Sequence, residues 1–522
     1  MPVLLSRIGQ IGMLEKRKTA EARQDSTMGL PMARIPALFL GLLACGLVLL
    51  LSLNTIAPPS QSYRKATHNR IHTVTGHEGD TDEPTFFCDI SRAECPKVNS
   101  RPKTGWHGGI PGLPDLHLYS AHLDTRVELR GRARHFARVL GVVREKEMDR
   151  LRFFCQLWYT DIPHPIIVEA TRREIWDARW DGGHSPTYYH PYLFSCPIPS
   201  NVSNFIAQGP VNVSLSLEPC ACPSHILSLP RLSQKPRRGF AVCVKGLDFP
   251  QDISVRLVEW IEMQYLLGAD TVFFYVLDVH PKVDLILRFY RRFRNLNFVK
   301  LRLPGRDEPN APIRRRNYLA KNSWQKRRHE LIPYNDCYYR HVSTHNFVLL
   351  VDTDEVVVPR RRDSWQQLID GVVRERPNVL SKYASLAVPN VYFFSQFGSE
   401  HLDRTDTTQL RLMTHVTRSA NFTRPGFAVK SFFTWNGSLA VFNHYSLVPL
   451  YSRLQHTALL SSDIVRLHHY KDACPRDMDT ECDNNFFKYT VRDESLWRFR
   501  DKLLLKIDET RISLKKLFLV MI

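Results

Sequence analysis

The sequence contains little glycine, no internal repeat and no heptad register. Only 24 of its 522 residues are glycine, which excludes a collagen-like chain, and the missing heptads exclude a coiled coil. No repeating unit of roughly 20 to 50 residues is visible, so a solenoid is not expected. Apolar residues make up 43% of the chain, which is enough for a large core and excludes wholesale disorder.

Acidic side chains are scarce relative to basic ones. There are 52 Asp and Glu against 71 Lys and Arg, for a formal net charge of +19. Such a balance suits a nucleic acid, an anionic membrane surface or an anionic small molecule as a partner. No aromatic and basic module of a known nucleic-acid-binding kind is visible, so nucleic acid is not an expected partner.

Charged residues are absent from one segment near the N-terminus, between Arg34 and Arg64. Its apolar core at 35–57 has the length of a helix that crosses a bilayer, about 20 residues. A buried helix of a soluble protein is the alternative, but such helices usually carry a polar face. The residues before it are too many for the n-region of a cleaved signal peptide. We therefore expect a cytosolic tail at 1–34 and a transmembrane signal anchor at 35–57.

The cysteines favour an oxidising compartment for the rest of the chain. Of the 11 cysteines, Cys45 lies in the expected span and the even number that follows suits disulfide pairing. None is spaced as in a zinc site. Proximity alone suggests the pairs Cys88–Cys95 and Cys474–Cys482. We expect a lumenal body, with N-glycosylation sequons at Asn201, Asn212, Asn421 and Asn436.

Composition divides this body into segments. Residues 58–84 are polar and open with Pro58-Pro59, as in a stem that does not fold alone. Residues 85–236 contain short strand-like runs and frequent proline, which predicts a β-rich lumenal subdomain. Residues 237–510 alternate between strands and helices, and 511–522 form a C-terminal tail.

The alternation after residue 237 predicts an α/β sheet. Gly268 should end the first helix in a left-handed conformation. Short connections favour a Rossmann-like, mostly parallel sheet with helices on both faces. In such sheets, ligands bind outside the C-terminal ends of the strands. We expect strands at 240–244, 271–277 and 347–351 and helices at 253–265, 283–290 and 365–372.

Three carboxylates, Asp352, Asp354 and Glu355, directly follow the apolar run 347–351. Crowded carboxylates repel one another, and a cation is their natural compensation. Mg²⁺ and Mn²⁺ prefer oxygen ligands and share them with phosphates, so the cluster predicts a metal and diphosphate site. A solvated acidic turn is the alternative, but apolar runs on both sides place the cluster at the end of a buried strand.

Basic residues and histidines supply further candidate ligands. Arg314 and Arg316 could bind phosphate oxygens, as could the cluster at 360–362, although a solvated basic face is the alternative for most of these arginines. His444 or His469 could complete the metal site, although a single histidine can equally be structural.

Several ordered motifs between residues 85 and 510 resemble glycosyltransferase family 92. The resemblance implies a GT-A fold and a type II Golgi membrane enzyme that uses UDP-galactose and a divalent cation, typically Mn²⁺. The motifs are Leu118-Tyr-Ser-Ala121, Cys243-Val-Lys-Gly246, Leu257-Val-Glu-Trp-Ile-Glu262, Asn335-Asp336-Cys337, Val351-Asp-Thr-Asp-Glu355, Leu467-His-His-Tyr-Lys471 and Val491-Arg-Asp493.

The resemblance also implies a reaction. Family members of known activity form β-1,4-galactosyl linkages with inversion, and their acceptors include terminal galactose and core fucose of glycoprotein N-glycans. Asp352 and Asp354 would be the DxD pair that contacts the nucleotide and the metal. His469 fits the family's His-Tyr-basic motif, with His444 as the second candidate for the third ligand.

An inverting transfer needs a carboxylate that removes the proton of the acceptor hydroxyl as it attacks the anomeric carbon. The candidates are Glu400, Asp403 and Asp406, in a polar stretch after a strand expected at 386–394. Two other functions stay open: a membrane-anchored glycan-binding protein without catalysis, and a glycosyltransferase for another UDP-sugar. The sequence is compatible with a homodimer.

Overall fold

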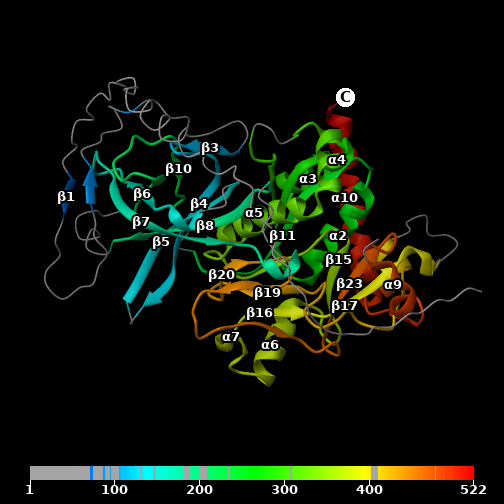
Figure 1. Ribbon diagram of the computed structural model, residues 1–522. Helices are drawn as coiled ribbons and strands as arrows, with labels where there is room; N and C mark the ends of the chain where they lie inside the picture. The colour runs from blue at the N-terminus through cyan, green and yellow to red at the C-terminus, as the bar shows by residue number, and fades with distance from the viewer. Residues whose placement is uncertain are drawn as a thin grey trace, which may run out of the picture. The chain divides into compact units, whose positions relative to one another are not determined.

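The structure is a computed structural model of the chain (Figure 1). The expected tail, the expected signal anchor and Asn201 lie outside the residues that it describes. No helix of the described part is both long and apolar enough to cross a membrane. The described residues belong to one compact unit, Asn69–Ile522. They are 71–73, 86–88, 95 and 105–521, with gaps at 130–131, 145–147, 182–186, 200–208, 233–234, 306–308, 401–409 and 476–477.

The N-terminal part of the described chain forms a ten-stranded antiparallel sheet. Its main path runs β10-β9-β6-β7-β8-β5-β4-β3, and β2, which pairs with β1, also pairs with β7. Apolar side chains from β4, β5, β6 and β8 share one hydrophobic core. The bounds are β1 Ile71–Thr73, β2 Phe86–Cys88, β3 His107–Ile110, β4 Leu113–Leu129, β5 Arg132–Val143, β6 Phe153–Trp158, β7 Ile166–Glu174, β8 His190–Ile198, β9 Asn212–Ser216 and β10 Leu227–Ser228.

The disulfides correct one of the two suggested pairings. Cys88 and Cys95 do not bond to each other, because their partners lie 132 and 127 residues further along the chain. The other suggested pair, near the C-terminus, is confirmed. The described disulfides are Cys88–Cys220, Cys95–Cys222, Cys155–Cys196, Cys243–Cys337 and Cys474–Cys482.

A seven-stranded sheet follows, in the order β13-β12-β11-β14-β19-β16-β22. Its first four strands are parallel, as the alternation of strands and helices predicts. β19 runs antiparallel to both β14 and β16, so the sheet as a whole is mixed. The bounds are β11 Arg238–Phe249, β12 Ala269–Val279, β13 Leu296–Lys300, β14 His345–Leu350, β16 Tyr383–Val388, β19 Lys430–Thr434 and β22 Gln455–Leu459.

Helices cover both faces of this sheet (Figure 1). Alternate residues of β11 point to opposite faces: Phe240 and Val242 join one hydrophobic core, and Ala241 and Cys243 join the other. Helices α2, α3, α6 and α10 contribute to the first core and α5 to the second. Gly268, at φ 115°, ends α2 as predicted. The bounds are α2 Ser254–Leu267, α3 Pro281–Phe293, α4 Pro312–Lys321, α5 Ser323–His341, α6 Trp365–Glu375 and α10 Arg500–Met521.

The strand expected at 386–394 is two strands, because Pro389 interrupts it. β16 ends at the residue before this proline and pairs in the seven-stranded sheet, whereas β17 begins after it and pairs with β23 in a three-stranded sheet. β15 lies on the other side of β23, in a register that places Glu355 opposite His469. The bounds are β15 Glu355–Pro359, β17 Asn390–Phe394 and β23 Val465–Lys471.

A buried polar network joins β4 of the ten-stranded sheet to the strands beside β14. The guanidinium of Arg126 donates to Asp124, to the hydroxyl of Tyr338 on α5, and to the backbone carbonyls of Trp435 and Ser438. The side chains of Arg126 and Asp124 are 3% and 0% exposed. The network therefore connects segments that are far apart in sequence through a single buried cation.

Candidate functional site

Asp352 and Asp354 lie between β14 and β15, at the C-terminal edge of the parallel strands. Lys245 and Lys430 each place Nζ 3.4 Å from Asp352 Oδ2, and Lys471 Nζ donates to Asp354 Oδ2 over 2.9 Å. Burial raises the pKa of Asp352, but the two lysines beside it outweigh this effect and hold that pKa well below its usual range. The turn therefore carries ionised carboxylates.

His469 on β23 faces the same turn. Its Nε2 lies 3.5 Å from Asp354 Oδ2, and its Nδ1 lies 3.5 Å from Glu355 Oε1. One ligand atom from each of these three side chains lies within 4.8 Å of the others, a spacing that suits a metal ion. Neither ring nitrogen of His469 has a hydrogen-bond partner, nor has Asp352 Oδ1, so these buried atoms are available to a ligand.

His444 lies outside this group. Its Nδ1 is 2.8 Å from the carbonyl oxygen of Val429, and its ring stacks on Trp180 with centroids 5.5 Å apart. Burial lowers the pKa of His444 to about 3, so its imidazole is neutral. Of the two candidate histidines, the fold brings only His469 to the carboxylates.

A cavity of about 820 Å³, here called the large cavity, opens beside the turn. Its wall includes the C-terminal part of β11, the start of α2, Asp352 and Asp354, and the segments 411–412 and 470–473. The volume falls within the range of small-molecule sites, roughly 300–1,000 Å³. Cations around such a cavity suit phosphate oxygens. The basic residues in its wall are Lys245, Arg256, Lys326, Arg411 and Lys471.

A known protein family matches the part of the chain that contains this site. The model of glycosyltransferase family 92 matches residues 238–509, more than half of the sequence, including Asp352, Asp354 and His469. This chain belongs to glycosyltransferase family 92. A search of curated proteins returns no match to it.

Solved structures of S. aureus TarS show a distant likeness to this family 92 chain. TarS 1-349 is 13% identical with a TM-score of 0.22, over 45% of this chain and 60% of that chain. TarS 1-349 in complex with UDP-GlcNAc is 12% identical with a TM-score of 0.22, over 45% of this chain and 60% of that chain. The structure of TarS is 11% identical with a TM-score of 0.24, over 46% of this chain and 38% of that chain. The chain thus spans about 60% of the first structure's length, and TM-scores this low carry no structural argument.

The arginines predicted to bind phosphate do not line the large cavity of the family 92 domain. Arg314 is exposed on α4. Arg316 forms ion pairs with Asp248 at 3.2 Å and with Asp278 at 2.9 Å. The lysines beside the turn come instead from three separate strands, β11, β19 and β23, and no basic cluster in the sequence marks them.

Two of those lysines could have been recognised from the sequence. Lys245 ends the apolar run of β11, and Lys430 begins the apolar strand β19. The side chain of Lys430 is 1% exposed and lies 3.3 Å from Glu355 Oε2. A lysine is almost never fully buried without a partner, so a single lysine in an apolar strand indicates a buried carboxylate nearby.

The predicted general bases are only partly placed. The side chain of Glu400 is 40% exposed, forms an ion pair with Arg492 and does not line the large cavity. Asp403 and Asp406 lie outside the described residues. The assignment of the base stays a prediction.

Three of the four glycosylation sequons lie in the described part. Asn212 begins β9, and Asn436 lies in the turn between β19 and β20 (Ser438–Val441). Asn421 donates from Nδ2 to Asn485 Oδ1 over 2.6 Å. Glycosylation at these positions stays a prediction.

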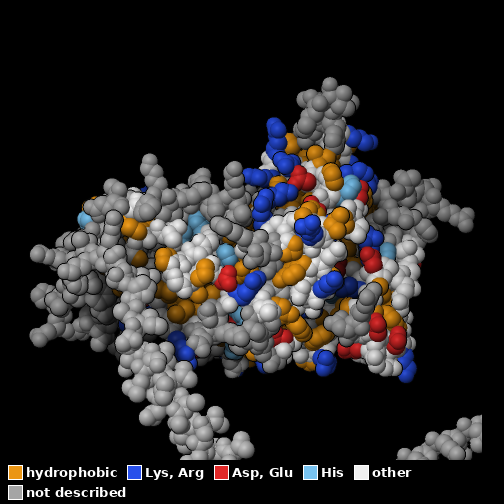
Figure 2. Space-filling view, turned by 45° about the horizontal axis from the view of Figure 1, so that its top comes forward, with side chains coloured by type: hydrophobic (Ala, Val, Ile, Leu, Met, Phe, Trp, Pro, Cys, Tyr) orange, Lys and Arg blue, Asp and Glu red, His pale blue; other side chains and the backbone are white. Residues whose placement is uncertain are grey.

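Positive charge is not confined to the large cavity. Figure 2 shows Lys and Arg side chains gathered on the upper part of the face that it displays. Exposed side chains cost little when they are charged, so a basic surface needs no bound partner. On α3 the exposed basic residues are Lys282, Arg288, Arg291 and Arg292.

Glu259 is a further residue of the large cavity that the sequence did not single out as functional. It lies on α2 and is 3% exposed. Its carboxylate accepts the backbone N–H groups of Arg411 and Leu412, over 3.1 and 2.7 Å. It thereby holds the segment from which Arg411 reaches Asp472, at 2.7 Å. Burial raises the pKa of Glu259 to about 7.

The change Glu259→Gln should remove part of the pH dependence of stability. Because the pKa of Glu259 in the folded chain lies above its ordinary value of 4.5, its contribution is fully present below pH 4.5 and is lost as the pH rises through 7. The wild-type free energy of unfolding should therefore lose about 3 kcal/mol over this window through Glu259. Urea unfolding at several pH values between 4.5 and 7 gives the free energy of unfolding of both proteins. If this free energy changed equally with pH in both, Glu259 would not titrate in that range.

Proposed function

We propose that this chain is an inverting galactosyltransferase with a GT-A fold. It transfers galactose from UDP-galactose, in β-1,4 linkage, to a terminal galactose or fucose of glycoprotein N-glycans. The observation that carries the proposal is the turn with Asp352 and Asp354, which lines the large cavity together with Lys245, Lys471 and Arg411. Carboxylates for a cation and basic groups for phosphate oxygens are the chemistry that a nucleotide-sugar donor requires.

The topology supports the GT-A assignment. The strand order runs β13-β12-β11 to one side and then turns back to β14 on the other side of β11. Open parallel sheets bind ligands at such a switch point, outside the C-terminal ends of the strands. The large cavity lies at this position, since residues after the apolar parts of β11 and β14 line it.

The residues present fit a divalent cation such as Mn²⁺. Asp354 and His469 would hold it, with Glu355 and Asp352 beside them, because the nitrogens of His469 and one oxygen of Asp352 are buried without hydrogen-bond partners. A cation bound there would stabilise the charge of the departing diphosphate.

The chain's own basic residues would bind the phosphates. Lys245 and Lys471 contact the carboxylates and also line the large cavity. Their ammonium groups therefore lie where the carboxylates border the cavity. Arg411 offers a planar guanidinium that can bind two phosphate oxygens. Inversion takes one displacement, in which a carboxylate accepts the acceptor's proton and no covalent nucleophile is needed.

A lumenal Golgi location suits this chemistry. The described residues contain five disulfides, which persist in oxidising compartments. We propose a single-pass type II protein, anchored through residues 35–57, that meets glycoprotein acceptors in the lumen. A homodimer is compatible with this arrangement.

Incubating the full-length chain with a panel of UDP-sugars and a glycan array, with and without Mn²⁺, tests this function. We expect transfer from UDP-galactose in the presence of Mn²⁺, and a β-1,4 linkage in the product by NMR. Transfer from UDP-glucose or a UDP-N-acetylhexosamine instead would contradict the donor assignment. Glycan binding without UDP release from any donor would favour a non-catalytic glycan-binding protein.

A further inference from the structure

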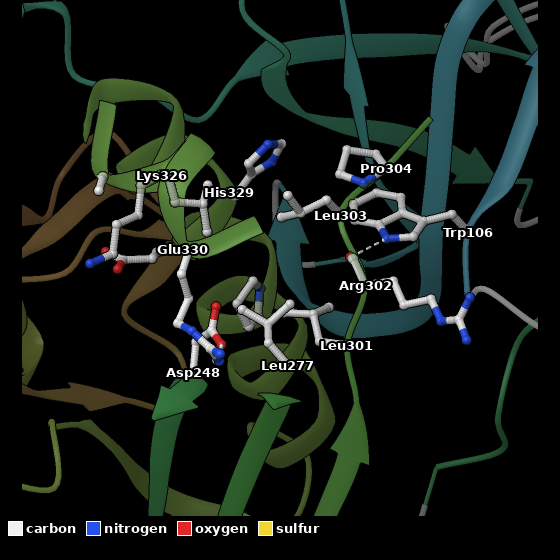
Figure 3. A pocket seen from close by; sticks show the side chains of 15 residues that line it. Trp106, Asp248, Leu277, Leu301, Arg302, Leu303, Pro304, Lys326, His329 and Glu330 are labelled. Carbon is white, nitrogen blue, oxygen red and sulfur yellow. Dashed lines mark hydrogen bonds and ion pairs between the residues drawn. The ribbon is translucent and has the colours of Figure 1, made fainter. Parts of the chain in front are cut away.

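A second, smaller cavity of about 160 Å³ adjoins the large cavity (Figure 3). The two share Gly246 and Lys326 in their walls. The small cavity lies at the C-terminal ends of β11, β12 and β13, against α4 and α5. Trp106, from the segment before β3, closes one side and donates from Nε1 to the carbonyl of Arg302 over 2.8 Å.

Much of the wall of the small cavity is apolar. A ligand part that enters it must present flat or apolar faces, because a polar group placed against such a wall loses its hydration without compensation. The apolar side chains are Trp106, Leu277, Leu301, Leu303, Pro304, Leu319 and Pro333.

His329 is the polar group of the small cavity that lacks partners. It lies on α5, is 9% exposed, and neither Nδ1 nor Nε2 makes a hydrogen bond. Burial lowers the pKa of His329 to about 3, so the ring is neutral and offers one N–H donor and one acceptor. Leaving both groups buried and unpaired is costly, and a bound ligand would remove that cost.

The carboxylates of the small cavity are already neutralised. Asp248 Oδ1 lies 2.8 Å from Arg315 Nη2 and 3.2 Å from Arg316 Nη1. Glu330 lies 3.4 Å from Lys245. Arg302 and Lys326 also belong to the wall, but both are exposed. The buried groups left for a ligand are therefore the neutral imidazole and the apolar walls, which suit an uncharged part of a ligand.

We propose that the small cavity binds the base of the donor nucleotide, a pyrimidine, and that His329 recognises the edge of that base. This rests on the proposed function, which places the diphosphate in the large cavity next door. The cavity is smaller than the roughly 300 Å³ at which sites for whole ligands begin, so it takes one ring. A uracil edge alternates N–H and carbonyl groups, to which a neutral imidazole can both donate and accept.

The small cavity is less suited to an acceptor sugar. A pyranose carries hydroxyl groups around its ring, and several of them would face Leu277, Leu301 and Leu303 without partners. A pyrimidine has apolar faces and polar atoms only at its edge, which matches a largely apolar wall in which the buried imidazole of His329 has no hydrogen-bond partner.

Calorimetric titration of UDP and of pyrophosphate, each with Mn²⁺, into the full-length chain tests the proposal. We expect His329→Ala to weaken UDP binding about tenfold, the effect of one buried hydrogen bond, and to leave pyrophosphate binding unchanged. Leu319→Trp, which fills the cavity from α4, should have the same selective effect. His341→Ala is the matched control, because it also removes a histidine of α5, a partly buried one, but lies outside both cavities.

Three outcomes would overturn the assignment. In the first, the affinities for UDP and for pyrophosphate fall together in folded His329→Ala and Leu319→Trp. In the second, neither affinity changes in these variants. In the third, UDP affinity stays constant while the KM for the acceptor glycan rises, which would make the small cavity an acceptor site. If the wild-type chain bound pyrophosphate but not UDP, the proposed donor would fail instead, and a titration with CDP would show whether another pyrimidine occupies the cavity.

Discussion

Replacing Asp352 and Asp354 together by alanine should abolish galactose transfer. Both carboxylates line the large cavity, where Asp352 lies beside Lys245 and Asp354 lies 3.5 Å from His469. Without them the site loses two of its oxygen ligands for a cation, and Lys245 and Lys430 keep Glu330 and Glu355 as their remaining carboxylate partners. Loss of one preorganised electrostatic group typically lowers kcat by about 10²–10³, so we expect at least about a 10³-fold loss for the pair. UDP release with UDP-galactose and an acceptor glycan measures it.

A matched control is Asp363→Ala, since the side chain of Asp363 is 71% exposed and lies outside the large cavity. It should transfer galactose at the wild-type rate. If the double variant remained folded and also kept the wild-type rate with Mn²⁺, these aspartates would not belong to the catalytic site.

Replacing Arg126 by methionine should strongly destabilise the fold. The guanidinium is buried and serves Asp124, the Tyr338 hydroxyl and two backbone carbonyls. Removal of one partner from a buried ion pair costs about 3–5 kcal/mol, because the other charge is left uncompensated. Of these two cations, Asp124 would keep only Arg138, at 3.0 Å. Urea unfolding measures the difference in free energy.

Arg152→Met provides the comparison for this effect. Arg152 also donates to a carboxylate, that of Glu169, but their side chains are 70% and 50% exposed. Solvent screens such a pair, so the variant should unfold close to the wild-type urea concentration. Equal losses in the two variants would show that burial of the Arg126 network contributes nothing to stability.

The parallel half of the seven-stranded sheet could be predicted because its signals are local. Apolar runs at 240–244, 271–277 and 347–351 became β11, β12 and β14, and Gly268 ends α2 where a left-handed residue is needed. The position of Asp352 at a strand end follows from the run before it. The place and direction of β19 in the sheet could not be predicted from local signals. They depend on its antiparallel pairing with β14 and β16, which lie far from it in the sequence.

The ligand set depended on contacts that sequence spacing does not encode. His469 faces the carboxylates because β23 pairs with β15, whereas His444 is held by Val429 and Trp180. Lys430 reaches Glu355 across different sheets. Arg316 is adjacent in sequence to other arginines, but its partners are carboxylates on β11 and β12.

The predicted pairing of Cys88 with Cys95 was wrong for a related physical reason. Cys88 and Cys95 are close in sequence, but each bonds to a cysteine far along the chain, Cys220 and Cys222 respectively. Chain proximity makes a pair easy to close, yet the fold decides which cysteines meet.

In the proposed function, Asp352 and Asp354, beside the large cavity, form a metal-dependent site for a uridine diphosphate sugar. Titration of UDP into the wild-type chain and into the Asp352→Ala, Asp354→Ala variant, each with and without Mn²⁺, tests it most directly. We expect Mn²⁺ to strengthen UDP binding in the wild type and to have no effect in the variant. The same UDP affinity in both proteins, whether or not Mn²⁺ is present, would contradict it.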